Sequence, residues 1–134
     1  MGKLVIVTNN FSHPAFKLLT NHKNLKVIYY ENNINLLDLL IKVKHNYDID
    51  HLILEPGGTL ASAFLRAGLI DHISLIIAPL LVGGKNTPSI IDGDSIHSVD
   101  ELYKLRALKL KRCDILEHSY LHLEYDVINN TVID

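Results

Sequence analysis

The sequence has little cysteine, little net charge and no long hydrophobic run, and each shortage excludes a class of protein. Its 134 residues include a single cysteine, Cys113, so no internal disulfide framework can form. The formal net charge of −2 at pH 7 suggests neither a nucleic-acid footprint nor a basic membrane anchor. No apolar stretch approaches the ~18 residues of a membrane-spanning helix, and the N-terminal run is too short for a secretory signal. We expect a cytoplasmic protein that binds neither nucleic acid nor membrane.

The chain does contain enough apolar residues to form a folded core. Hydrophobic residues make up 48% of the sequence, which is typical of a globular protein rather than a disordered one. No repeat, low-complexity tract or linker divides the chain. We therefore expect a single domain over residues 1–134.

The hydrophobic pattern alternates between short apolar runs and stretches with helical spacing. This order predicts an α/β fold with a mostly parallel sheet, closed by a C-terminal antiparallel hairpin. Ser12 and Asn33 are the expected N-caps of the first two helices. The expected strands cover residues 4–7, 26–30, 51–54 and 73–81, the hairpin strands residues 108–116 and 120–128, and the helices residues 12–21, 34–43 and 59–67.

Two adjacent glycines, Gly57 and Gly58, lie where a predicted strand ends and a predicted helix begins. Residues without a β-carbon adopt backbone conformations closed to others and let another group approach the main chain closely. The following helix start offers unpaired N–H groups, and Thr59 adds a hydroxyl, so the turn suits a phosphate or pyrophosphate. A plain tight turn is the alternative explanation, because glycines are common where a strand leads into a helix. The spacing matches neither the G-x-G-x-x-G pattern nor the P-loop.

Other candidate sites have simpler structural explanations. The eight histidines form no H-x-x-x-H pair on one predicted helix, and no cysteine cluster supports them, so we expect no metal site. The Ile91–Ser95 segment resembles part of a calcium loop but lacks the remaining ligands, and it is interpreted as a solvated turn. Cys113 is interpreted as a structural thiol.

The stretch from Leu52 to Gly84 resembles the C-terminal reductase domain of the riboflavin-biosynthesis bifunctional deaminase/reductase family. The matching residues, in chain order, are Glu55, Gly57, Gly58, Thr59, Leu60, Gly68, Leu69, Ile70, Asp71, Ala78, Pro79, Gly83 and Gly84. The resemblance implies a dihydrofolate reductase-like, three-layer α/β fold. The family's opening strand and its Ser-Leu-Asp-Gly motif are not found here, so the resemblance covers only the latter part of the family's domain.

The resemblance also implies an activity. The family reduces a ribosylaminopyrimidine 5′-phosphate, of the 5-amino-6-(5-phosphoribosylamino)uracil type, to its ribityl form with NADPH. By this resemblance Gly57, Gly58, Thr59 and Leu60 hold the cofactor pyrophosphate, and the Gly57–Gly58 peptide is cis. Thr8 and Asn9 match the loop that contacts the 2′-phosphate side of the adenosine. Glu55 matches a catalytic acid near the substrate and the nicotinamide.

Three departures from the family pattern bear on these implications. Pro56 replaces a residue that is usually small, and His72 stands where the family often has Glu. The segment after the first strand contains no arginine to pair with a 2′-phosphate, which leaves NADPH against NADH open.

The missing opening strand lies at the centre of the sheet in the related fold. Its absence would expose two strand edges and an apolar face, which invite pairing with another chain. We therefore expect a homo-oligomer, a dimer first, or a complex with a complementing N-terminal chain. The alternative to an active reductase is a catalytically inactive half-domain or subunit that binds nucleotide or a partner chain without turnover.

Overall fold

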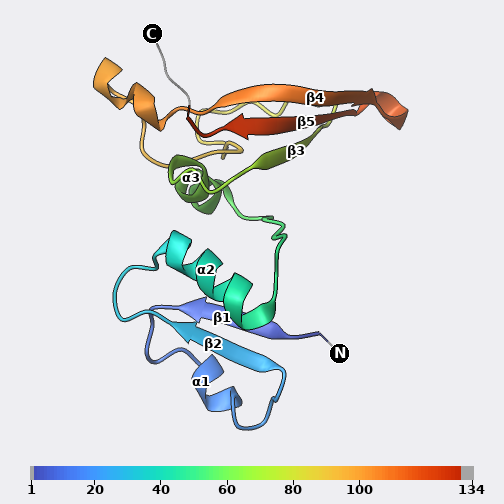
Figure 1. Cartoon of the computed structure of the whole chain (residues 1–134). Helices are drawn as coiled ribbons and strands as arrows, with labels where there is room; N and C mark the ends of the chain where they lie inside the picture. Colours follow the sequence, from blue (N-terminus) through green and yellow to red (C-terminus); the bar gives the residue numbers. More distant parts are fainter. Residues whose placement is uncertain (1, 131–134) are drawn as a thin grey trace. The chain divides into compact units, whose positions relative to one another are not determined.

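The computed structural model describes residues 2–130, and the chain falls into two compact units, Met1–Asp50 and His51–Asp134 (Figure 1). Each unit contains both helices and strands. The expected α/β class is therefore confirmed. Among the described residues, no helix combines the length and the apolar character needed to cross a membrane.

The first unit is a β-α-β-α arrangement built on a two-stranded sheet. Its elements, in order, are β1 (Leu4–Thr8), α1 (Ala15–Leu18), β2 (Leu25–Tyr29) and α2 (Leu36–Tyr47). The two strands pair in parallel, from Leu4 opposite Leu25 to Thr8 opposite Tyr29. Figure 1 shows α1 and α2 on opposite sides of this sheet. Parallel pairing places the carboxyl ends of both strands at one rim, as the sequence predicted.

The two predicted helix caps in this unit are wrong. The N-cap of α2 is Asn35, not Asn33, and its Oδ1 accepts a hydrogen bond from the Asp38 amide at 3.0 Å. α1 has Pro14 at its N-cap position, and the Ala15 amide at its start donates to His13 Nδ1 at 3.1 Å. The Ser12 amide instead donates to Asn10 Oδ1 at 2.9 Å, which closes a local turn before the helix.

The second unit combines one helix with a three-stranded antiparallel sheet. Its main elements are α3 (Gly58–Arg66), β3 (His72–Ile77), β4 (Ala107–Ile115) and β5 (Leu121–Ile128), with short 3₁₀ turns at Val99–Lys104 and Glu117–Ser119. The strand order is β3-β5-β4. The predicted hairpin is confirmed as β4 and β5. Its turn places His118 and Ser119 at positive φ.

Two expectations for this unit are wrong. Residues 51–54 form no strand, and the Ile53 side chain is 84% exposed. β3 does not continue the parallel sheet but pairs antiparallel with β5, from His72 opposite Asp126 to Ile77 opposite Leu121. The alternation of polar and apolar residues along β3 matches that along β5, so antiparallel pairing gives both strands a common apolar face.

Few apolar side chains of the described residues are buried. The buried ones are Ala15 and Leu25 in the first unit and Phe64 in the second. Leu37 and Ile41, one turn apart on α2, are 56% and 48% exposed, and Ile115 on β4 is 82% exposed. Each unit therefore has exposed apolar side chains. An exposed apolar face was the reason why a partner chain was predicted from the sequence.

Candidate functional site

The predicted site residues belong to two different units of the chain. Thr8 and Asn9 follow β1 in the first unit, whereas Glu55 and residues 57–60 lie in the second. Each group is described within its own unit. Of the predicted set, Gly57, Gly58, Thr59 and Leu60 are brought together at the start of α3.

The start of α3 is a helix N-terminus without a side-chain cap. Gly57 is the N-cap residue, with φ −68° and ψ 164°, and its carbonyl accepts the first helical bond from the Ala61 amide at 3.1 Å. The first amides of a helix have no acceptor within the helix, and Gly57 has no side chain to supply one. Thr59 and Leu60 are exposed. This turn therefore presents backbone N–H donors and a partial positive charge.

The glycine pair differs from the sequence-based expectation in two ways. Every peptide bond within residues 2–130 is trans, so the expected cis Gly57–Gly58 bond is wrong. Neither glycine has a positive φ, so neither is needed for an unusual backbone conformation. What distinguishes the two glycines is the space around each of them.

Position 58 requires glycine, because other atoms of the chain lie too close for a β-carbon. A β-carbon at residue 58 would lie 2.8 Å from Asp92 Cγ and 2.9 Å from the Ser89 carbonyl oxygen. A β-carbon at Gly57 would meet no described atom of its own unit within 4 Å. The turn is therefore open at Gly57, while the side at Gly58 is filled by a loop.

That loop, residues 89–95, is here called the strap because it runs along α3. The Asp92 amide donates to the Gly58 carbonyl at 3.2 Å, near the start of the helix. The Arg66 guanidinium donates to the Asp94 carbonyl at the end of the helix. A hollow of about 500 Å³ between the strap and the helix end is lined by Arg66, Ser89 and residues 91–96. The sequence predicted a solvated turn at Ile91–Ser95, within the strap, because no local pattern showed that this segment packs on a helix.

Glu55 lies in the extended segment that leads to Gly57. It is exposed, and within residues 2–130 no hydrogen-bond donor or cation contacts its carboxylate. Its carboxylate is therefore not committed to a structural contact within the described residues.

Thr8 and Asn9 differ in how accessible they are. Thr8 is 8% exposed, and its Oγ1 accepts a hydrogen bond from the Asn10 amide at 3.0 Å. Its hydroxyl therefore stabilises the turn after β1 and keeps its own proton and a second lone pair for other partners. Asn9 is exposed and can offer its amide group directly.

A polar cluster at the end of β2 was not found from the sequence. The Tyr30 hydroxyl donates to Asp38 Oδ2 at 2.7 Å, and Lys42 Nζ lies 2.6 Å from the same oxygen and 4.5 Å from the centre of the Tyr30 ring. The hydrogen bonds from Lys42 and Tyr30 lower the pKa of Asp38. Partial burial and the Asp38 contact raise the pKa of Tyr30, and the same carboxylate raises the pKa of Lys42. In the sequence, only the four-residue spacing of Asp38 and Lys42 on a predicted helix indicated that these two side chains could pair.

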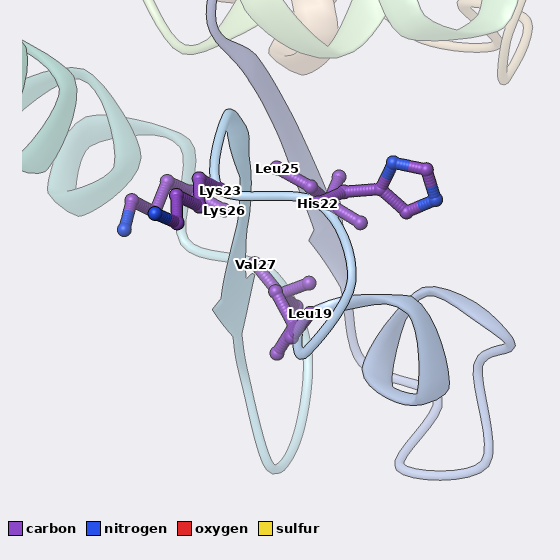
Figure 2. Close-up of a pocket in the computed structure, with 6 residues that line it drawn as sticks. All are labelled: Leu19, His22, Lys23, Leu25, Lys26 and Val27. Atoms are coloured by element: carbon purple, nitrogen blue, oxygen red, sulfur yellow. The ribbon is translucent and has the colours of Figure 1, made fainter.

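A second hollow, in the first unit, contains none of the predicted residues. It measures about 520 Å³ and is lined by Leu19, His22, Lys23, Leu25, Lys26 and Val27 (Figure 2). Figure 2 shows the side chains of Lys23 and Lys26 running out on one side and His22 on the other. The three basic groups do not converge, so the hollow does not form an anion site. Within residues 2–130 no three His, Cys, Asp or Glu side chains gather as a metal site.

Comparison with known proteins identifies the family. The RibD C-terminal domain family matches residues 3–117. The chain is 37% identical, over 116 residues, to the 2,5-diamino-6-ribosylamino-4(3H)-pyrimidinone 5′-phosphate reductase of Methanothermobacter thermautotrophicus, covering 87% of this chain and 52% of that protein. It is 38% identical over 96 residues to the riboflavin biosynthesis protein RibD of Actinobacillus pleuropneumoniae, covering 72% and 24%.

Solved structures agree with this assignment at the level of the fold. A pyrimidine reductase-like protein from Corynebacterium diphtheriae superposes with a TM-score of 0.71 at 18% identity, covering 92% of this chain and 50% of that one. Acinetobacter baumannii RibD gives 0.67 at 24% identity, covering 92% and 37%. These likenesses confirm the dihydrofolate reductase-like fold class. The chain spans about half the length, or less, of these relatives.

The ordered matches around the glycine pair, the fold and the family match over 3–117 agree with one another. The chain belongs to the RibD C-terminal domain family.

Proposed function

We propose that this chain is part of a reductase of riboflavin biosynthesis, with residues 1–134 forming a partial reductase domain that acts in the cytoplasm. Its substrate is a ribosylaminopyrimidine 5′-phosphate and its reductant is NADPH. The observation that carries the proposal is the 37% identity to a pyrimidinone phosphate reductase over 87% of this chain. The uncapped start of α3, open at Gly57, supports it because it fits a dinucleotide's diphosphate.

The residues have distinct tasks in this proposal. The amides of Gly58, Thr59 and Leu60 and the Thr59 hydroxyl bind the diphosphate, and the open face of Gly57 lets it approach. Asn9, with the Thr8 hydroxyl, contacts the adenosine 2′-phosphate side. A bound nicotinamide supplies the hydride. Glu55 is the acid of this proposal, passing to the substrate the proton that balances the hydride, and water resupplies that proton.

The alternative is a half-domain that binds nucleotide or a partner chain without turnover. It is favoured by the exposed apolar surface of both units, which leaves room for a second chain to complete a site. A complementing N-terminal chain or a second copy is the partner in this alternative. The two functions differ in whether the purified chain, without a partner, reduces the ribosylaminopyrimidine phosphate.

The test measures NADPH oxidation with each ribosylaminopyrimidine phosphate, the 2,5-diamino-pyrimidinone form and the 5-amino-uracil form. The proposal predicts turnover with at least one of them, and a loss of about 100-fold or more in kcat for Glu55→Gln with NADPH affinity unchanged. NADPH binding without turnover of either substrate would favour the half-domain. Absence of NADPH binding would refute the reductase.

A further inference from the structure

The strap places a carboxylate against the first turn of α3. The β-carbon position of Gly58 lies 2.8 Å from Asp92 Cγ, so the carboxylate rests on the face that a side chain would otherwise cover. The backbone follows the same path, because the Asp92 amide donates to the Gly58 carbonyl at 3.2 Å. The contact therefore involves both the main chain and the side chain of Asp92.

The carboxylate is held in this position by Ser89. The Ser89 amide donates to Asp92 Oδ1 at 3.1 Å, and the Ser89 hydroxyl shares its one proton between that oxygen, at 2.8 Å, and the Ile91 carbonyl, at 2.7 Å. Both bonds to Asp92 use the same oxygen, so Oδ2 is the oxygen turned toward Gly58. A negative charge is therefore fixed at the helix start, where the helix dipole favours an anion.

The strap is anchored to α3 at two further points. A β-carbon at Gly93, whose φ is +102°, would lie 2.7 Å from Ser62 Oγ, and Ser62 is buried. Arg66 donates to the Asp94 carbonyl. The positive φ and the close approach to Ser62 both require glycine at position 93. The position of Asp92 is thus set by a segment packed along the whole helix.

We propose that Asp92 is a resident anion at the start of α3, which competes with the diphosphate of the cofactor and sets its affinity. The inference rests on the proposed function, because it concerns the same helix start. A diphosphate over the amides of residues 58–60 lies close to the Asp92 carboxylate, and like charges at that distance repel. Binding therefore requires the carboxylate to leave its Ser89 partners, or the strap to move.

A purely structural role for Asp92 makes a different prediction. If the carboxylate only stabilises the helix start, its neutralisation lowers the stability of the fold and leaves cofactor affinity unchanged. Asparagine keeps an oxygen that accepts from Ser89 and removes the charge, so Asp92→Asn separates the two roles. Asp94→Asn is the matched control, because it removes a charge from the same strap at a position where the backbone carbonyl, not the side chain, contacts α3.

The experiment titrates the wild type and both variants with NADPH, followed by the fluorescence of the reduced nicotinamide. Asp92→Asn should bind about 3- to 10-fold more tightly than the wild type, and the gain should shrink as salt is added. Asp94→Asn should change affinity by less than about two-fold. Unchanged or weaker binding by Asp92→Asn, with the wild type binding normally, overturns this inference and leaves the proposed function intact. Absence of NADPH binding by the wild type and by both variants refutes this inference and the proposed function together.

Hydrogen exchange of the wild type gives an independent readout. Saturating NADPH should slow exchange of the first amides of α3 and speed exchange in residues 89–95, because the strap gives way to the ligand. Slower exchange in both segments would mean that the strap closes over the cofactor. That result would contradict competition by Asp92.

Discussion

At the scale of single residues, the two glycines before α3 have different tasks. Gly58 is held between the helix start and the strap, whereas Gly57 faces open space within its unit. The sequence left two explanations of the pair open, a plain tight turn and the close approach of another group to the main chain. It could not show that the group at Gly58 is Asp92, which lies 34 positions later in the chain, since such a contact leaves no local pattern.

Alanine substitutions should separate the two glycines. Gly58→Ala should lower the free energy of unfolding by about 1–3 kcal/mol, because its β-carbon would overlap the Ser89 carbonyl and Asp92. Gly57→Ala is the control and should cost less, about 0.5–1 kcal/mol, because alanine is a poorer N-cap than glycine but its β-carbon meets no described atom of its own unit. Urea unfolding of the three proteins measures the difference. Equal effects at both positions would show that the strap does not pack on Gly58.

Asn9 offers a residue-scale test of cofactor preference. Asn9→Asp places a negative charge where the proposal puts the adenosine 2′-phosphate, so NADPH should bind about 5- to 10-fold more weakly. NADH, which lacks that phosphate, is the internal control and should bind as before. Fluorescence titration with both cofactors measures the ratio. An equal loss for both would place Asn9 away from the 2′-phosphate.

The Tyr30–Asp38–Lys42 cluster predicts a pH dependence of stability. The pKa of Asp38 is lowered in the fold, so its contribution is present above the ordinary value of 3.8 and is lost as pH falls through the lowered pKa. The pKa values of Tyr30 and Lys42 are raised from 10.0 and 10.5, so their contributions are lost as pH rises through the raised values.

Asp38→Asn should therefore be less stable than the wild type at pH 7, and the difference should vanish in acid. Urea unfolding at pH 7 and at a pH well below 3.8 checks this. A difference that persists undiminished in acid would mean that the carboxylate's charge is not what stabilises the cluster.

At the scale of elements, local signals predicted most of the helices and strands and failed where partners lie far along the chain. α3 ends where expected, with Gly68 at φ +68° and its amide donating to the Leu65 carbonyl at 3.0 Å. The strand expected at residues 51–54 does not form, because an apolar run becomes a strand only when another strand offers hydrogen bonds. The pairing of β3 with β5 was likewise invisible in the order of elements alone.

The N-cap of α2 provides an element-scale prediction with a control beside it. Asn35→Ala should cost about 1 kcal/mol of stability, because the Asp38 amide loses its acceptor. Asn33→Ala, at the position that the sequence pattern favoured, should have almost no effect. Thermal unfolding of both variants measures the contrast. A larger loss of stability for Asn33→Ala than for Asn35→Ala would show that Asn33 caps the helix, as predicted from the sequence.

At the scale of the whole molecule, the exposed apolar side chains make self-association the expected state. Leu37 and Ile41 on α2 and Leu110 and Ile115 on β4 are each about half exposed or more, and both sheets have unpaired edge strands within the described residues. Size-exclusion chromatography with light scattering at micromolar concentration should therefore give a mass of at least two chains. A monodisperse monomer would contradict this expectation.

The central claim is that the open N-terminus of α3 binds the diphosphate of a nicotinamide cofactor. The most direct test is an NADPH titration of Gly57→Glu, which adds a negative charge in open space, beside Ala63→Glu, which adds the same charge on an exposed part of the helix. We predict that Gly57→Glu loses affinity by about ten-fold or more while Ala63→Glu stays within about two-fold of the wild type. Equal affinity in all three proteins would contradict the claim.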